Sequence, residues 1–314
     1  MKTYTQQDFD ALVRDENGYL HCPAGDWRNV KFGGAANIVF AADCKLGDDC
    51  KLGDDCKLGD GCKLGDGCKL GDGCKLGDAC TLGNVCTLGN RCTLGNVCTL
   101  GNRCTLGNRC TLGDECKLGD DCTLGNGCTL GDDCTLGNVC TLGNRCTLGD
   151  WCTLGNRCTL GNRCTLGNGC TLGNRCTLGN WCTLGNWCTL GNVCTLGDGC
   201  TLGDGCTLGN VCTLGNWCKL GDGCTLEGGR IQNATFFFTS NIGRANRTAY
   251  AYCNTQTGEM FIRAGCWFGD IDAFEQRVRD VHAGTHHETD YLAFAQFARA
   301  RFERYGQNVK EAER

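Results

Sequence analysis

The sequence predicts an all-β protein whose central part is a triangular parallel β-solenoid of about ten coils. Residues 44–223 are 30 consecutive copies of one six-residue word, Cys-Lys/Thr-Leu-Gly-Asp/Asn-X, without insertion or deletion. In every word Cys is first and Leu is third, so these two side chains point one way and the side chain between them points the other way. The strict period and this alternation are the two observations that predict the fold.

Each position of the word has a structural interpretation. The first three positions alternate inward, outward and inward, which is the period of a β-strand. The Gly and Asp/Asn that follow, such as Gly83 and Asn84, are predicted to form a turn, because both tolerate positive φ. A short strand and a bend in each word close one triangular coil every three words. With strands about 4.8 Å apart, ten coils give a rod roughly 48 Å long.

In this repeat the chain resembles the hexapeptide-repeat, left-handed parallel β-helix family. That family has an inward aliphatic residue, a small residue two places before it, and Gly or an acidic residue after it. Leu46, Cys44 and Gly47 fill these places in the first word. The resemblance implies the left-handed coil, which is an exception to the right-handed crossover rule. It also implies self-association, since many members of that family trimerise side by side.

The segments before and after the repeat are predicted to close its ends. Residues 1–43 form an N-terminal cap with a short helix over 6–14 and strand-like residues 19–40, in which Ile38 and Phe40 take the Cys and Leu places. Residues 44–226 form the solenoid, and residues 227–314 form a small α+β capping and assembly domain. The N-terminus is polar, so we expect no signal peptide, no membrane partner and a cytoplasmic location in the producing cell.

The C-terminal segment contains strand and helix patterns. A strand is predicted at 235–239 and a hairpin from 247–254 and 259–264. Asp272 and Glu275 predict a capping box for a helix that buries Phe274, Val278 and Val281 and ends at Gly284. A second helix is predicted over 291–305, burying Phe294, Phe297, Phe302 and Tyr305 and ending at Gly306.

One short motif in this segment carries a second resemblance. Gly265-Cys266-Trp267-Phe268-Gly269, which leads into the first of these helices, resembles the closing domain of uncharacterised hexapeptide-repeat proteins of bacteriophages and prophages. That resemblance implies a source for the protein and no particular activity.

The chain is unusually rich in cysteine. Of its 34 Cys, 31 follow the six-residue period from Cys44 to Cys224, at a position that the fold reserves for a small buried side chain. In a reducing compartment free Cys serves as a compact hydrophobe, so no metal and no cofactor is predicted. Disulfides between stacked coils are an alternative, but the sequence shows no two-coil alternation to match them. Zinc is another, but it needs four converging thiolates, and spacing of six lacks close pairs.

Charge and histidine content argue against two classes of function. The net charge is −5, and residues 44–223 carry 15 basic and 18 acidic residues, so no nucleic-acid partner is predicted. Acyltransferases and carbonic anhydrases of the family use His for catalysis or zinc binding, and the repeat has none. Besides His21, ligand-type residues occur only in a cluster that is predicted to be a surface loop: His282, His286, His287, Glu288 and Asp290. No catalytic residue is predicted.

The last position of each word varies most, and every third word contributes to one of three columns along the rod. Arg and Trp are preferred anchors of protein interfaces, so these columns are the predicted binding surface. The alternative is that each Trp only packs over its neighbours at a corner. The predicted residues are Arg91, Arg109, Arg145, Arg163, Trp181 and Trp217 in one column, Arg157 and Arg175 in a second, and Trp151 and Trp187 in a third.

The sequence therefore predicts a non-enzymatic β-solenoid that acts as a structural scaffold or interaction protein, related to phage proteins and forming a homo-oligomer. The alternative is an inhibitor or binding protein that acts on a host or virion protein through the Arg and Trp columns. A hexapeptide-type acyltransferase is the third. Outward Thr columns, such as Thr81 and Thr99, resemble ice-binding solenoids only weakly, because the second outward place is not uniformly small and uncharged.

Overall fold

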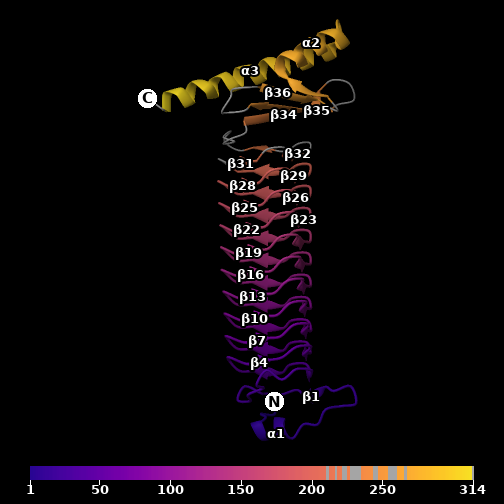
Figure 1. Ribbon diagram of the computed structural model, residues 1–314, viewed down its shortest axis with the longest axis vertical. Coiled ribbons are helices and arrows are strands. Elements are labelled where there is room, and N and C mark those ends of the chain that lie inside the picture. The colour runs from indigo at the N-terminus through magenta and orange to yellow at the C-terminus, as the bar shows by residue number, and fades with distance from the viewer. Residues whose placement is uncertain are drawn as a thin grey trace.

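The computed structural model describes residues 1–209, 212–215, 218–220, 225–226, 235–242, 247–253, 260–264 and 267–312. The chain forms a long three-sided rod, with a small sheet and two helices at the end opposite the N-terminus (Figure 1). Parallel sheets of 12, 10 and 11 strands form the three sides of the rod. The predicted parallel β-solenoid is confirmed, with about eleven turns, because strands outside the 30 words extend the stack at both ends.

The strands of the solenoid are Lys/Thr-Leu pairs. They run from β3 (Lys45–Leu46) to β33 (Thr225–Leu226), each beginning six residues after the previous one. The first face is β1-β2-β5-β8-β11-β14-β17-β20-β23-β26-β29-β32, the second is β4-β7-β10-β13-β16-β19-β22-β25-β28-β31, and the third is β3-β6-β9-β12-β15-β18-β21-β24-β27-β30-β33. Each strand pairs with the strand 18 residues later, so that Leu88 lies on Leu106.

The core of the rod consists of the stacked Leu and Cys columns. The repeat Leu from 46 to 214 are at most 4% exposed, and burying each one stabilises the fold by about 2 kcal/mol. Each described Cys of the repeat is buried beside them, and nearly all of these Cys also use the thiol as a donor. The Cys86 Sγ, for example, donates to the carbonyl oxygen of Gly65 in the previous coil at 3.3 Å. The Cys position is thus filled by a side chain that is both small and able to satisfy a buried carbonyl.

The turn differs from the prediction in which residue has positive φ. The Gly of the word does not have it; in the described words a non-Gly X residue has a φ between 53° and 62°, as at Val139 and Trp151. The Gly is required for a different reason, because its Cα lies against the previous coil. A Cβ added at Gly83 would lie 2.7 Å from the backbone N of Asp66 and 2.7 Å from the carbonyl carbon of Gly65. Turn propensity predicted positive φ at the wrong residue of the word, because the packing of one coil on the next determines where Gly is needed.

The Asp or Asn of the word joins consecutive coils through its side chain. The Oδ1 of Asn126 accepts from the backbone N–H of Asn144 at 2.6 Å, and Asn144 does the same for Asn162 at 2.7 Å. The X residue adds a backbone bond across the same corner: the N–H of Val85 donates to the carbonyl of Asn102 at 2.8 Å. Each corner is therefore held by one side-chain ladder and one main-chain ladder.

The N-terminal segment continues the stack and covers its first coil. β1 (Leu20–Cys22) and β2 (Ile38–Phe40) add to the first face, and Phe40 pairs with Leu58 in register. Ile38 and Phe40 are buried, as predicted. Helix α1 (Gln6–Asp10) has a capping box between Thr5 and Asp8 and is shorter than the predicted 6–14. The fully buried Trp27 stacks on Tyr4 with ring centroids 4.1 Å apart, which closes this end with aromatic surface.

The C-terminal unit is an antiparallel four-stranded sheet with two helices. Its strands are β34 (Thr235–Ile242), β35 (Arg247–Cys253), β36 (Met260–Ala264) and β37 (Trp267–Asp270), in that order. The predicted hairpin is present as β35 and β36. The last strand was not predicted, because the Trp-Phe-Gly motif was interpreted only as a lead into the helix.

Helix α2 (Ile271–His282) corrects the predicted capping box. Its N-cap is Asp270, whose carboxylate accepts from the N–H of Ala273 at 2.7 Å. Asp272 and Glu275 instead bind the Arg299 guanidinium, which ties α2 to α3. Phe274 and Val278 are buried as predicted, but Val281 is 58% exposed, because it lies on the outer side of the last turn.

Helix α3 (His286–Ala312) is longer than the predicted 291–305 at both ends. The predicted loop over 282–290 is therefore wrong: only three residues separate the helices. The Thr285 Oγ1 accepts from the N–H of Glu288 at 3.4 Å, and the Glu288 carboxylate accepts from the N–H of Gly284 at 2.7 Å. This Thr-x-x-Glu cap restarts the helix directly after Gly284. Phe294 and Phe302 are buried as predicted, Phe297 is 57% exposed, and the side chain of Tyr305 is outside the described part.

The positive φ of X leads to a stability prediction. Replacing Val139 by Asn should raise the free energy of unfolding by about 1 kcal/mol, since a β-branched residue is strained in this conformation and Asn is not. The same residue placed at Thr141, on the strand β19 (Thr141–Leu142), should lower it by roughly 0.5–1 kcal/mol through poorer β-propensity. Urea unfolding followed by circular dichroism measures both. If Val139→Asn lowered the free energy of unfolding as much as Thr141→Asn does, the corner would not be strained.

Candidate binding surface on the corners of the rod

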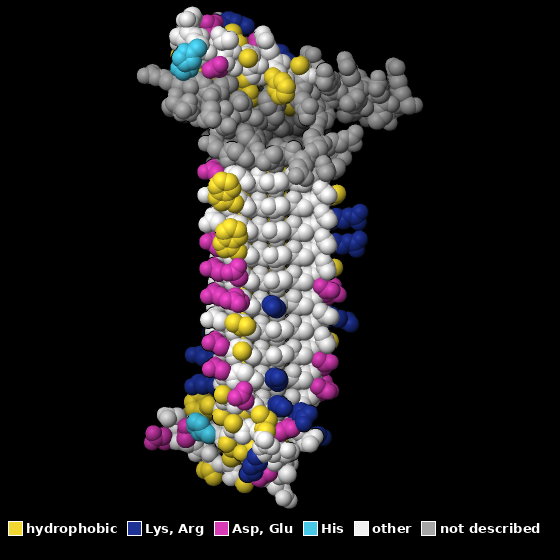
Figure 2. Space-filling model, turned by 180° about the vertical axis from the view of Figure 1, so that it is seen from behind, with side chains coloured by type: hydrophobic (Ala, Val, Ile, Leu, Met, Phe, Trp, Pro, Cys, Tyr) yellow, Lys and Arg dark blue, Asp and Glu magenta, His cyan; other side chains and the backbone are white. Residues whose placement is uncertain are grey.

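The X residues form three rows of side chains along the edges of the rod. Because X has left-handed backbone at each corner, its side chain leaves the rod sideways, and the stacking repeats it at about 4.8 Å. Figure 2 shows side chains projecting from the edges of the rod, whereas the face between them is nearly flat and mostly uncharged. Variable side chains are thus confined to these edges, apart from the outward Lys or Thr of each strand.

We name the three corners by their charge. The basic corner, where the second face turns into the first, holds Arg91, Arg109, Arg145, Arg163 and Trp181. The acidic corner, where the first face turns into the third, holds Glu115, Asp133, Trp151 and Trp187. The mixed corner, where the third face turns into the second, holds Val85, Arg103, Asp121, Val139, Arg157, Arg175 and Val193.

The structure brings some of the predicted residues together and separates others. Five of them line the basic corner, while Arg157 and Arg175 lie on the mixed corner. The Trp do not form one patch: Trp181 lies on the basic corner, and Trp151 and Trp187 lie on the acidic corner across the first face. Trp217 is outside the described residues.

The described Trp at the corners are exposed but also pack on the next coil. Trp151, Trp181 and Trp187 are 61%, 59% and 67% exposed. Each one has a Gly at the X position 18 residues later, and a Cβ added at Gly169, for instance, would collide with the indole of Trp151. The corner-packing interpretation is therefore correct for one side of each ring. The remaining exposed surface is still large for Trp.

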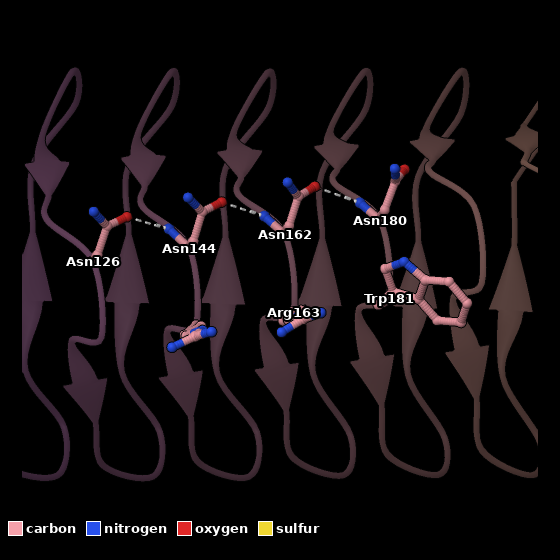
Figure 3. Close-up of a pocket in the computed structure, with 7 residues that line it drawn as sticks. Asn126, Asn144, Asn162, Arg163, Asn180 and Trp181 are labelled. Atoms are coloured by element: carbon pink, nitrogen blue, oxygen red, sulfur yellow. Dashed lines mark hydrogen bonds between the residues drawn. The ribbon is translucent and has the colours of Figure 1, made fainter.

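The basic corner carries a shallow groove of about 570 Å³. It is lined by Asn126, Asn144, Arg145, Asn162, Arg163, Asn180 and Trp181, and Figure 3 shows the four Asn in a row beside Arg163 and Trp181. Each Asn Oδ1 already accepts from the next coil, so the amide NH₂ groups are the side-chain donors that remain for a ligand. With two guanidinium groups and no acidic lining residue, the groove favours an anionic partner. The Asn residues were missed in the sequence, although Asn in every third word from 90 to 180 was the signal.

The acidic corner has the opposite character at the same height of the rod. Its turn positions hold Asp114, Glu115, Asp132, Asp133 and Asp150, and no basic residue interrupts them. The first face, which lies between the two corners, presents uncharged Thr on seven consecutive strands: Thr93, Thr111, Thr129, Thr147, Thr165, Thr183 and Thr201. The rod is thus electrically polarised across one flat face.

The cysteine columns are buried, and neighbouring thiols shift each other's pKa in both directions: the Cys104 and Cys140 thiols, for example, lower the pKa of Cys122. Every described Cys of the repeat is buried and outside any disulfide, and the described residues contain no cluster of three or more possible metal ligands. Burial raises the pKa of Cys22 to about 12. The neighbouring Cys116 thiol, together with burial, raises the pKa of Cys98 to about 11. At neutral pH these groups are thiols, which are poor nucleophiles.

The histidines do not form a catalytic constellation among the described residues. The His21 ring lies 2.7 Å from the Asp15 carboxylate on the cap, and this hydrogen bond lowers the pKa of Asp15. The other His lie at the opposite end of the rod, where His286 and His287 follow each other at the start of α3 (Figure 1). The described His therefore lie at the two ends of the rod and not on its coil surface.

Thiol reactivity tests the buried columns. Native protein at pH 7.5 should react with a thiol reagent at few of its 34 Cys, and denatured protein at nearly all of them, because the reagent needs an accessible thiolate. Raising the pH to 9 should change the native count little, since the buried thiols stay out of reach of the reagent. Anaerobically purified protein that holds stoichiometric metal or mostly oxidised Cys would contradict this account.

Comparison with known families agrees with the geometry of the rod. The family described as bacterial transferase hexapeptide (six repeats) matches residues 43–78, 97–132, 127–162 and 157–192, all at or within the solenoid. The chain matches no curated protein and no solved structure at a significant level. In the part that the structure describes, no helix is long and apolar enough to cross a bilayer. The matched segments cover less than half of the chain's 314 residues, and they show that the repeat region is similar to hexapeptide-repeat proteins.

Proposed function

We propose that the protein is a non-enzymatic, self-associating scaffold whose corners bind protein surfaces. The observation that carries this proposal is that large side chains are held at left-handed corner positions and left exposed. Arg109, Trp151 and Trp181 have φ of 59°, 60° and 61°, and each of the two Trp is about 60% exposed. Neither the backbone nor the core requires these residues.

The left-handed backbone at X has a conformational cost for every residue other than Gly. Left-handed backbone costs a residue other than Gly about 1–2 kcal/mol, and the same corner position is filled by Gly in several words, as at Gly61, Gly127 and Gly169. A chain built for stability alone would use Gly or Asn at every corner. Strained positions of this kind concentrate at functional sites, so the Arg and Trp rows are the binding surface that we propose.

The proposed partners are those expected for a self-associating scaffold. We propose that the protein first binds other copies of itself, with the C-terminal unit contributing to assembly, and that a host or virion protein is the alternative partner. The relationship to phage proteins rests on the motif at residues 265–269 alone. We place the protein in the cytoplasm of the producing cell, where reducing conditions would keep the buried Cys as thiols.

Removing the exposed indoles tests the proposal. Replacing Trp151, Trp181 and Trp187 together by Gly should leave the rod folded, because Gly occupies the same corner in other words. The assembly should lose mass, or its captured partners, since each interface Trp commonly contributes about 2 kcal/mol or more. Light scattering and pull-down with quantified partners measure this. The matched control is the triple change of Val85, Val97 and Val139 to Gly, which should leave both unchanged.

If the Trp variant keeps both its mass and its partners, the corners carry no binding function. The C-terminal unit would then be the place to examine.

The family match favours a second candidate, acyl transfer. A hexapeptide-type acyltransferase would need a base, and His21 with Asp15 is the one His–carboxylate pair at 4 Å or less in the described residues. Acetyl-CoA consumption in the presence of pooled amine and alcohol acceptors tests it. We expect no turnover above that of the His21→Ala variant; turnover that this change abolishes would replace the scaffold proposal.

A further inference from the structure

We propose that two copies pack side by side, parallel and in axial register, through their first faces, so that the basic corner of each lies against the acidic corner of the other. This inference rests on the proposed self-association and specifies its geometry. It uses three independent properties of the rod: the charge on its corners, the order of those corners around the rod, and the spacing of its coils.

The two corners that flank the first face carry opposite charges over the same part of the rod. Between residues 90 and 181 the turn positions of the basic corner hold four Arg, six Asn and no acidic residue. Between residues 114 and 150 those of the acidic corner hold five acidic residues and no basic one. The two stretches overlap along the axis. A surface with opposite charges on its two edges is complementary to a copy of itself.

The order of the corners selects the orientation of the second copy. The first face lies between the two corners: from Arg109 the chain passes through β14 (Thr111–Leu112) to Glu115. A two-fold axis parallel to the rods places the first face of one copy against the first face of the other. The basic corner of each copy then lies beside the acidic corner of its partner at nearly the same height. An antiparallel arrangement would instead bring like corners together, with Arg opposite Arg, which repels.

The register then produces matched pairs at several heights. Partners across the interface are six residues apart in sequence, or one third of a coil, which is about 1.6 Å along the axis. Arg109 of one copy lies opposite Glu115 of the other, an ion pair. Arg145 lies opposite Trp151, a cation–π pair, and Trp181 lies opposite Trp187, an aromatic pair. From Arg91 to Trp187 no residue meets a like charge. Nearer the N-terminus Asp54 and Asp72 lie opposite Asp60 and Asp78, and the outward Lys57 and Lys75 of the first face lie between these acidic edges.

The spacing of the groove favours a second rod over other anions. The Asn and Arg donors of the groove repeat once per coil, at about 4.8 Å, and so do the carboxylates of the acidic corner, because both are β-stacks. An extended acidic peptide presents same-side carboxylates about 6.6 Å apart, and duplex DNA has one phosphate per about 3.4 Å of each strand. Only a ligand with the period of the rod can stay in register over several coils.

Charge exchange at one pair tests the geometry. Arg109→Glu alone places Glu opposite Glu at both edges, and Glu115→Arg alone places Arg opposite Arg. Each should weaken self-association by about tenfold or more. An equimolar mixture of the two variants should restore it, because every edge then pairs Glu with Arg, and the double variant should also restore it. The matched controls are Arg103→Glu and Asp121→Arg on the mixed corner, which should change nothing. Arg109 and Glu115 are already non-Gly residues with φ of 59° and 56°, so the backbone at these two positions tolerates the exchange.

Orientation is tested separately with fluorescent proteins fused to the chain ends. Two N-terminal fusions should show strong energy transfer, and an N-terminal with a C-terminal fusion should show weak transfer, because the rod is tens of ångströms long. The reverse pattern would overturn the parallel arrangement.

The oligomeric mass separates this inference from the proposed function. A mass of two chains for the native protein, with the expected pattern of variants, supports both. Association that none of the corner charges affects, or a number of chains other than two, would overturn this arrangement and leave the scaffold proposal standing. A single chain at all concentrations would remove self-association itself.

Discussion

The close stacking of one coil on the next is the constraint on which the rest of this structure depends. Backbones approach at each Gly so tightly that a Cβ there would overlap the coil below, and this approach lets the Asp or Asn side chain reach the N–H of the next coil. The same closeness places Leu on Leu and lets the Cys thiol of most described words reach a Gly carbonyl, as Cys86 does at Gly65. A word of six residues can therefore satisfy its buried polar groups only when it is repeated.

Stacking also sets which residue has left-handed backbone. Gly and Asn are the residues that ordinarily adopt positive φ, yet here their positions are occupied by packing and by the side-chain ladder. The strain passes to X, whose side chain projects from the corner of the rod. X can therefore vary without altering the core, which makes it a position where a contact surface can form.

Much of the fold could be predicted from the sequence, because strand alternation and period depend on residues that repeat without exception, such as Leu88 and Cys86. The cap register at Phe40 was also predictable, since it continues that alternation. The turn at Val139 was not, because the interaction that decides it joins residues 18 apart. The start of α3 was missed because Gly284 was interpreted as a break, whereas the Thr285 and Glu288 cap restarts the helix at once. The ten predicted site residues could also be sorted into three columns, because every third word stacks on the same corner.

The choice between Asp and Asn is the strongest sign that the corner charges are selected. Either residue supplies an Oδ1 to the next coil, as Asp132 and Asn144 both do, so folding does not distinguish them. Between residues 90 and 180 every turn residue of the basic corner is nevertheless Asn, whereas the acidic corner has Asp at 114, 132 and 150. Stacked carboxylates repel one another in the same rod, so an acidic row carries an electrostatic penalty in the isolated chain. A basic row on a neighbouring surface would offset that penalty, and the rod itself provides one across its first face.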